Sequence, residues 1–158
     1  MSKALVTYFS ATGTTARVAQ KLAEAIHATL FEIEPQERYT SADLDWNDAA
    51  SRTSKEKDDP AMRPAIAKKI ADIDAYDTIF VGFPIWWYVA PNIVNTFLES
   101  YDLSGKTVVP FATSGGSSMG RTNDVLAPSC PNAKLKQGRR FTSNASAGEL
   151  KTWAEAFL

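Results

Sequence analysis

The first 26 residues pass from an apolar run through a hydroxyl-rich turn into an amphipathic helical pattern. The run Ala4–Phe9 predicts a buried strand. Val18, Leu22 and Ile26 then recur every four positions, which is the spacing of one helix face. A strand that leads straight into a helix needs a neighbouring parallel strand, because the helix packs back over the sheet. This opening therefore favours an alternating α/β fold.

The turn between that strand and that helix, residues 10–15, is expected to bind an anion. The free N–H groups and the positive end of the helix dipole point at one place, and the hydroxyls add further donors. Because the turn holds no lysine or arginine, a phosphate there is held by hydrogen bonds and the dipole alone. An ordinary helix cap is the alternative when the turn is considered by itself. The residues of this predicted site are Ser10, Thr12, Gly13, Thr14 and Thr15.

Strand-like and helical patterns alternate along the rest of the chain. Further strands are expected at Thr29–Ile33, Thr78–Gly82, Thr107–Ala112 and, more weakly, Lys134–Leu135. Further helices are expected over 61–73, from Pro91 onward, over 120–126, and after a capping box that opens at Ser146. Such alternation predicts a parallel sheet with helices on both faces. Ligands bind such sheets at the carboxyl ends of the strands, where the strand order reverses.

The loops after the first, third and fourth strands should therefore meet at one site. The loop after the third strand carries three consecutive aromatics, which suit stacking on a flat ring. The loop after the fourth is rich in glycine and hydroxyls, which suits close approach of backbone amides to a polar ring edge. The candidate residues are Pro84, Ile85, Trp86, Trp87 and Tyr88 in one loop and Thr113, Ser114, Gly115, Gly116, Ser117 and Gly120 in the other.

A phosphate site, a flat-ring site and a polar ring edge together describe a mononucleotide, and flavin mononucleotide (FMN) fits best. The flavin would carry the redox chemistry, so no catalytic side chain is predicted. Each loop also has a simpler interpretation. The aromatics at 86–88 also suit core packing or a dimer contact, and the glycines at 115–116 also suit a tight turn. The sequence leaves open which aromatics face the flavin.

The run Ser10-Ala11-Thr12-Gly13-Thr14-Thr15 resembles the S-x-T-G-x-T phosphate loop of the flavodoxin family. The resemblance covers nearly the whole chain. It implies a three-layer sandwich around a five-stranded parallel sheet of order 2-1-3-4-5. It also implies that residues 10–15 hold the FMN phosphate and that loops 84–88 and 113–120 hold the isoalloxazine ring. Electron transfer through flavin oxidation and reduction is the function that the resemblance implies first.

The loop after the third strand departs from the electron-carrier pattern. Those carriers often have a glycine and acidic residues there, and Pro84–Ala90 contains neither. Its sequence, Pro84-Ile85-Trp86-Trp87-x-x-Ala90-Pro91, is also similar to the ring-binding loop of flavodoxin-fold quinone reductases. An FMN-dependent NAD(P)H:quinone or nitro-compound reductase is therefore the alternative function. A nucleotide-binding module without turnover is a second alternative. The partners would be redox proteins or a small-molecule electron acceptor.

Length and composition favour a single cytoplasmic domain, residues 1–158. The net charge of -1 gives no reason to expect nucleic acid as a partner. The most apolar region, residues 78–94, is interrupted by Gly82 and Pro84, so no membrane span is predicted. A lone cysteine, Cys130, and the absence of a signal-peptide pattern favour a reducing compartment. Oligomeric state is not predicted.

The segment 34–60 is too long for an ordinary connection after the second strand. Its second half is polar and charged, as in a mobile linker. Its first half contains Tyr39, Leu44 and Trp46, which could anchor it as a lid near the flavin. The sequence leaves both interpretations open.

Overall fold

A parallel sheet of order β2-β1-β3-β4-β5 forms the centre of the molecule. The computed structural model describes residues 3–114 and 118–158. The predicted α/β class and the strand order 2-1-3-4-5 are confirmed. The strands are β1 (Ala4–Tyr8), β2 (Thr29–Glu32), β3 (Thr78–Pro84), β4 (Thr107–Thr113), β5 (Lys134–Leu135) and β6 (Arg139–Phe141).

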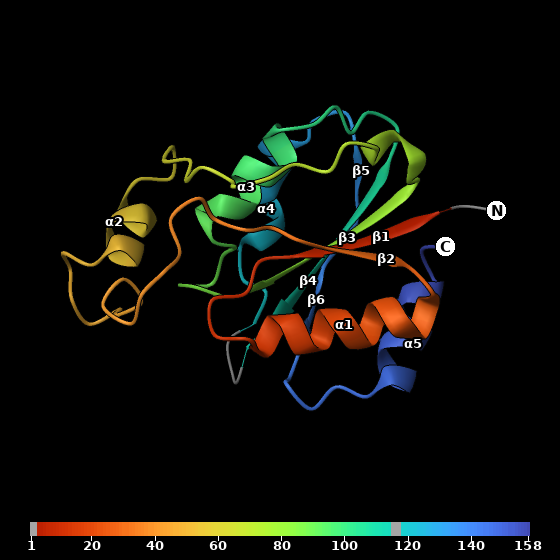
Figure 1. Ribbon diagram of the computed structural model, residues 1–158, viewed down its shortest axis with the longest axis horizontal. Coiled ribbons are helices and arrows are strands. Elements are labelled where there is room, and N and C mark those ends of the chain that lie inside the picture. Colours follow the sequence, from red (N-terminus) through yellow and green to blue (C-terminus); the bar gives the residue numbers. More distant parts are fainter. Residues whose placement is uncertain (1–2, 115–117) are drawn as a thin grey trace.

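Helices cover both faces of the sheet (Figure 1). α1 and α5 lie on one face, and α3 and α4 lie on the other. Neighbouring residues of β1 show the same division, because Leu5 belongs to one buried cluster and Val6 to the second. The helices are α1 (Thr14–Ile26), α2 (Arg52–Asp58), α3 (Asn92–Glu99), α4 (Thr122–Leu126) and α5 (Ala147–Glu155), with 3₁₀ turns at Ile73–Ala75 and Ala127–Ser129. In the part of the chain that the structure describes, every helix is too short or too polar to cross a membrane.

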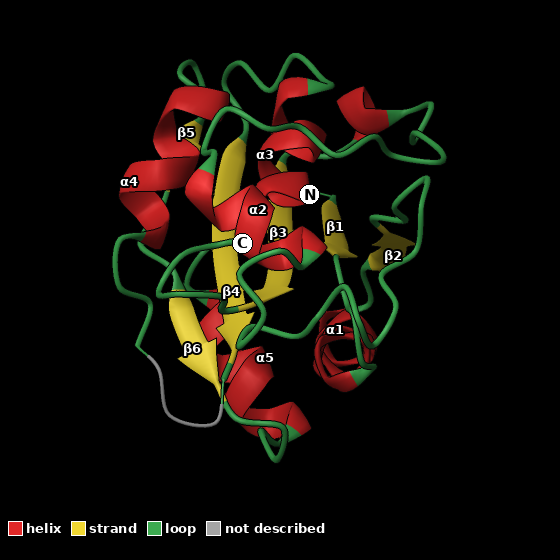
Figure 2. Cartoon of the chain, turned by 90° about the vertical axis from the view of Figure 1, so that its left-hand side faces the viewer, coloured by secondary structure: helices red, strands yellow, loops and turns green. Residues whose placement is uncertain are grey.

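The edge position beside β4 is filled by two short strands, β5 and β6 (Figure 2). Pro110 in β4 explains the interruption, because proline has no N–H to donate to a neighbouring strand. The side chain of Asn123 fills the gap. Its amide donates to the Lys136 carbonyl over 2.8 Å and accepts from the Gly138 N–H over 3.2 Å. The sequence patterns identified β5 and missed β6.

The helix predicted over residues 61–73 is wrong. Pro35 and Ile66 instead form an antiparallel bridge. The Gln36 N–H donates to the Ala65 carbonyl over 2.9 Å, and the Ala67 N–H donates to the Glu34 carbonyl over 2.8 Å. These bonds use the Ala65 carbonyl and the Ala67 N–H, which a helix here would need, so the spacing of the isoleucines does not produce a helix.

The helix of this region is α2, within the segment 34–60. Its first turn is capped by the Ser51 hydroxyl, which accepts from the Ser54 N–H over 3.3 Å. Its buried side is polar and includes Thr53, Ser54 and Glu56. α2 stands beyond the carboxyl ends of the strands, away from both helical layers (Figure 1).

Candidate functional site

The predicted phosphate turn joins the end of β1 to the start of α1. Gly13 is the N-cap of α1 and has a φ of 96°, which is the left-handed region that favours glycine. Its own N–H donates to the Ser10 hydroxyl over 3.0 Å. No side chain among the described residues caps α1. The N–H groups of its first turn and the dipole of this 13-residue helix are therefore available to an anion.

Thr113, the last residue of β4, joins the three predicted loops. Its hydroxyl lies 2.7 Å from the Thr15 hydroxyl in the first turn of α1. Its carbonyl accepts from the N–H of Ile85, in the loop after β3, over 3.2 Å. The carboxyl ends of β1, β3 and β4 therefore form one continuous edge. The Thr15 hydroxyl is buried and already makes this one hydrogen bond to Thr113.

The aromatic loop after β3 is a tight two-residue turn. Trp86 and Val89 exchange backbone hydrogen bonds of 3.1 and 3.2 Å. The two residues between them, Trp87 and Tyr88, have φ values of 52° and 64°. Positive φ at both central positions is the pattern of a type I′ turn, which normally uses Asn-Gly. Large side chains in this conformation are strained, and such strain concentrates at functional sites.

Gly120 brings the loop after β4 against that turn. It has a φ of 54°, and a Cβ there would lie only 2.4 Å from the Tyr88 carbonyl oxygen. The next N–H, of Arg121, donates to the same carbonyl over 3.0 Å. Gly120, predicted to lie beside the ring, thus contacts the aromatic turn itself. The predicted residues Gly115, Gly116 and Ser117 lie outside the described residues.

The three aromatics of the loop differ in their surroundings. Trp86 packs edge-on against Phe9 and Tyr39, with ring centroids 5.7 and 5.5 Å apart. Tyr88 is 60% exposed. Trp87 is partly buried, and the Lys57 ammonium lies 5.2 Å from its ring centroid. Trp86 therefore packs against the core, but like Trp87 it is only partly buried and lines the cavity described below.

The segment 34–60 is anchored to this site through Tyr39. The Tyr39 hydroxyl donates to the Glu56 carboxylate over 2.7 Å, and the Arg52 guanidinium lies 3.8 Å from the Tyr39 ring centroid. Arg52 also donates to Glu56 over 3.1 Å. Burial, and then the hydrogen bond to Glu56, raise the pKa of Tyr39 above its ordinary value. Tyr39 therefore stays protonated and acts as a donor.

A cavity of about 460 Å³ opens between these elements. Its volume lies in the range of small-molecule sites. The predicted residues and the segment 34–60 both line it. The phosphate turn contributes Ala11, Thr12, Thr14 and Thr15, the aromatic loop contributes Pro84, Ile85, Trp86 and Trp87, and the long segment contributes Leu44, Trp46 and Thr53. Leu44 and Trp46 were recognisable as apolar residues in a polar segment, whereas nothing in the sequence marks Thr53.

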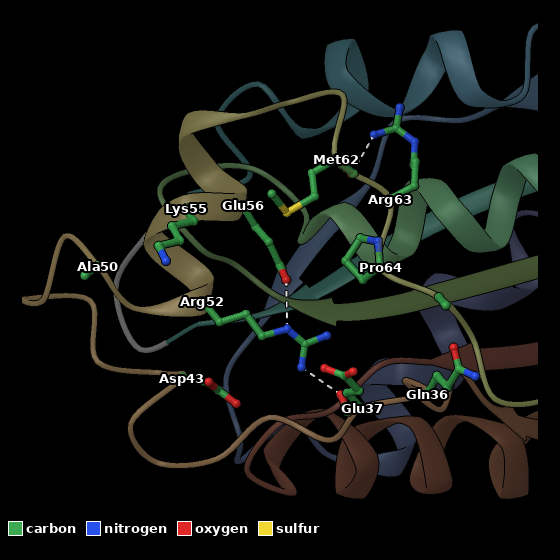
Figure 3. A pocket seen from close by; sticks show the side chains of 11 residues that line it. Gln36, Glu37, Asp43, Ala50, Arg52, Lys55, Glu56, Met62, Arg63 and Pro64 are labelled. Carbon is green, nitrogen blue, oxygen red and sulfur yellow. Dashed lines mark hydrogen bonds and ion pairs between the residues drawn. The ribbon is translucent and has the colours of Figure 1, made fainter.

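A separate cavity of about 530 Å³ is lined in part by Arg52, Lys55 and Glu56 of α2 (Figure 3). None of the described residues that were predicted to bind a cofactor lines it. Arg52, one of its lining residues, donates to the Glu56 carboxylate and, over 2.7 Å, to the Glu37 carbonyl. This cavity therefore lacks the uncapped helix end and the aromatic wall of the first.

A parallel α/β sheet of order β2-β1-β3-β4-β5 with helices on both faces defines a doubly wound protein. The chain belongs to the flavodoxin family, whose model matches residues 3–157. No curated protein matches it.

Solved structures of related proteins share the fold along nearly the whole chain. A provisionally assigned flavoprotein of Bacteroides eggerthii is 52% identical with a TM-score of 0.93, and the match covers 99% of this chain and 98% of that one. One of Bacteroides uniformis is 51% identical with a TM-score of 0.92, and the match covers 98% of each chain. A flavoprotein of Lactobacillus acidophilus in complex with FMN is 21% identical with a TM-score of 0.75, and the match covers 98% of this chain and 99% of that one.

Proposed function

We propose that this protein binds FMN and moves electrons through flavin oxidation and reduction. The observation that carries the proposal is that the uncapped start of α1 and the aromatic loop after β3 line one cavity. A phosphate fits the first and a flat ring fits the second. The FMN held by a flavoprotein of the same fold gives further support.

The residues present fit FMN in their chemistry. First-turn N–H groups of α1 and the hydroxyls of Thr12 and Thr14 supply donors without a full positive charge. Trp87 supplies an accessible aromatic face beside the cavity. FMN supplies the redox chemistry when bound, and the protein binds it, orients its ring and keeps water from one side.

A reductase that acts on a small molecule is the second candidate, favoured by the closed geometry of the aromatic turn. Two backbone hydrogen bonds between Trp86 and Val89 hold the peptides at Trp87 and Tyr88 in place. Electron-carrier flavodoxins flip a peptide in this loop when the flavin is reduced, and here neither central residue of the turn is a glycine that would ease such a flip. This arrangement favours two-electron chemistry with NAD(P)H as donor and a quinone or nitro compound as acceptor.

The phosphate assignment is tested by replacing Thr12 and Thr14 together with valine. We expect FMN affinity to fall about tenfold or more, since two hydrogen bonds to a charged group are lost, and riboflavin affinity to stay nearly constant. Quenching of flavin fluorescence on titration measures both. Thr152→Val, an exposed threonine on α5, is the matched control. Equal losses for FMN and riboflavin contradict the assignment.

The reaction is tested by anaerobic reduction of the flavin-loaded protein. An electron carrier is expected to show a long-wavelength absorbance band midway through the titration. A two-electron reductase is expected to lose its yellow colour in one phase and to oxidise NAD(P)H rapidly when a quinone is added. Protein that binds FMN but undergoes neither process is a binding module without turnover.

A further inference from the structure

A second cavity, of about 440 Å³, adjoins the proposed FMN cavity. Thr53, Trp86 and Trp87 line both, so the two cavities share a wall. The rest of the second cavity is mainly apolar. Its apolar lining includes Val89, Ala90, Pro91 and Val125. A cavity of this size and character suits one flat ring system beside the proposed flavin ring.

Two cations line the same cavity, and both are held close to the aromatic turn. The Lys57 ammonium lies 5.2 Å from the Trp87 ring centroid. The Arg121 N–H donates to the Tyr88 carbonyl over 3.0 Å, which fixes the start of the Arg121 side chain. Within residues 3–114 and 118–158, the Arg121 guanidinium has no hydrogen bond or ion pair. In this described part of the chain, the one ion pair of Lys57 is with the exposed Asp58, over 3.5 Å.

Among the described residues that line the cavity, Glu56 is the one acidic residue. Its carboxylate already accepts from Tyr39 and Arg52, and the residue is only 4% exposed. Its negative charge is thus compensated by Arg52, which lies outside the cavity lining. Lys57 and Arg121 therefore leave the cavity with an unbalanced positive charge, which favours an anionic ligand.

α2 is held at this cavity by Asn92, at the start of α3. The Asn92 amide donates to the carbonyls of Glu56 and Asp59, each over 3.0 Å. These bonds satisfy carbonyls at the end of α2 and tie the helix to the segment that follows the aromatic turn. Lys57 is therefore placed by a fixed element.

We propose that this second cavity binds an aromatic ring that carries an acidic group, and that this molecule is the electron acceptor of the flavin chemistry. The assignment as acceptor rests on the proposed function. For a quinone of this kind, two electrons and two protons pass from reduced FMN to the two carbonyl oxygens. The products are the hydroquinone and oxidised FMN, which NAD(P)H then reduces again. Lys57 and Arg121 bind the acidic group and take no part in the transfer.

The test compares 2-naphthoate with its neutral analogue 2-naphthamide by calorimetry, on protein saturated with FMN at low ionic strength. We expect naphthoate to bind about three- to tenfold more tightly, since each exposed cation contributes a modest Coulombic attraction. The variant with Lys57→Gln and Arg121→Gln should bind the two equally. Lys55→Gln, on the same helix but outside this cavity, should keep the preference.

Equal binding of both compounds by the natural protein overturns the proposal, as does a preference that survives in the double variant. A naphthoate affinity that falls as FMN is raised beyond saturation also overturns it, because the two are then competing for one cavity. FMN uptake is measured separately by flavin fluorescence in every variant. A natural protein that takes up no FMN refutes the proposed function, whereas a lost naphthoate preference with intact FMN uptake refutes the acceptor cavity alone.

Discussion

The hydroxyls of Thr15 and Thr113 lie 2.7 Å apart in the interior, between residues separated by 98 positions in the chain. Both residues are at most 5% exposed. This bond joins the first turn of α1 to the end of β4, so it sets the distance between the proposed phosphate turn and the loop after β4. A buried hydroxyl that loses its partner is destabilising, because water does not reach it.

We expect Thr113→Val to lower the free energy of unfolding by about 1–3 kcal/mol, since it leaves the Thr15 hydroxyl without a partner. The double variant, with Thr15→Val as well, should regain part of that loss because no orphaned hydroxyl remains. Urea denaturation of the two single variants and the double variant measures the coupling. Strictly additive losses contradict a shared hydrogen bond.

Because Gly120 contacts Tyr88 closely, we expect a substitution at Gly120 to lower the stability of the protein as well. Gly120→Ala places a methyl group 2.4 Å from the Tyr88 carbonyl oxygen at a φ of 54°, so the aromatic turn has to move. We expect a loss of about 1–3 kcal/mol in unfolding free energy and weaker FMN binding. Gly148→Ala is the matched control, because a Cβ there meets nothing within 4 Å and Gly148 lies in helix α5. Its stability should be unchanged or slightly higher.

The side chain of Asn123 bridges the gap between β5 and β6, so we expect its replacement to lower the stability of the protein. Asn123→Ala leaves the Lys136 carbonyl and the Gly138 N–H without this partner, which should cost about 1–3 kcal/mol. Asn123→Asp keeps an acceptor for Gly138 but has no donor for Lys136, so it should also be destabilised. Asn144→Ala, at an exposed position, is the control. Thermal unfolding of the three variants measures the difference, and a fully stable Asn123→Ala protein contradicts the role given to Asn123.

Patterns in the sequence predicted the structure correctly wherever local chemistry and tertiary packing favour the same conformation. The run from Ala4 through the turn at residues 10–15 combines a buried strand with an amphipathic helix, and both appear as predicted. The cap of α5 does too, because the Ser146 hydroxyl accepts from the Glu149 N–H over 3.1 Å. Such features depend on neighbours a few residues away, which the sequence shows directly.

Features that depend on distant partners were missed. α2 buries the polar residues Thr53 and Glu56, so it has no apolar periodicity, and Glu56 is satisfied by Tyr39 from another part of the chain. β6 contains two arginines and pairs at the sheet edge, where a short polar strand carries little hydrophobic signal. The pairing of Ile66 with Pro35 likewise overrides a helix-like spacing of isoleucines.

Because Arg63 and Glu99 form an ion pair, we expect part of the protein's stability to be lost in acid. Arg63 donates to both carboxylate oxygens, over 2.9 and 3.1 Å, and Ser129 donates over 2.7 Å. The Arg63 hydrogen bonds, with help from Ser129, hold the pKa of Glu99 below its usual 4.5. Because the folded-state pKa is the lower one, this contribution is present above pH 4.5 and is lost as the pH falls below it.

We therefore expect Glu99→Gln to be less stable than the natural protein at pH 7, and the difference to shrink in acid. The magnitude should be about 0.5 kcal/mol, since the Glu99 side chain is 40% exposed and solvent screens the pair. Urea denaturation between pH 3 and about 7 spans this titration. Glu24→Gln, an exposed carboxylate without an ion pair in the described part of the chain, should show no comparable loss. A pH-independent difference contradicts the assignment to Glu99.

The last prediction concerns the hydrogen bond from Tyr39 to Glu56, which anchors the segment 34–60. Tyr39→Phe keeps the ring that packs on Trp86 but removes one donor from a carboxylate that is only 4% exposed. We expect a loss of about 1–3 kcal/mol in unfolding free energy near neutral pH. Because the pKa of Tyr39 is raised above its ordinary 10.0, this stabilisation is present below pH 10 and is lost as the pH rises further. Urea denaturation from pH 7 upward should therefore show a difference that narrows in alkali, whereas Tyr88→Phe, at a 60% exposed position, should show little difference at any pH. If Tyr39→Phe matches the natural protein at neutral pH, the hydrogen bond does not hold this segment in place.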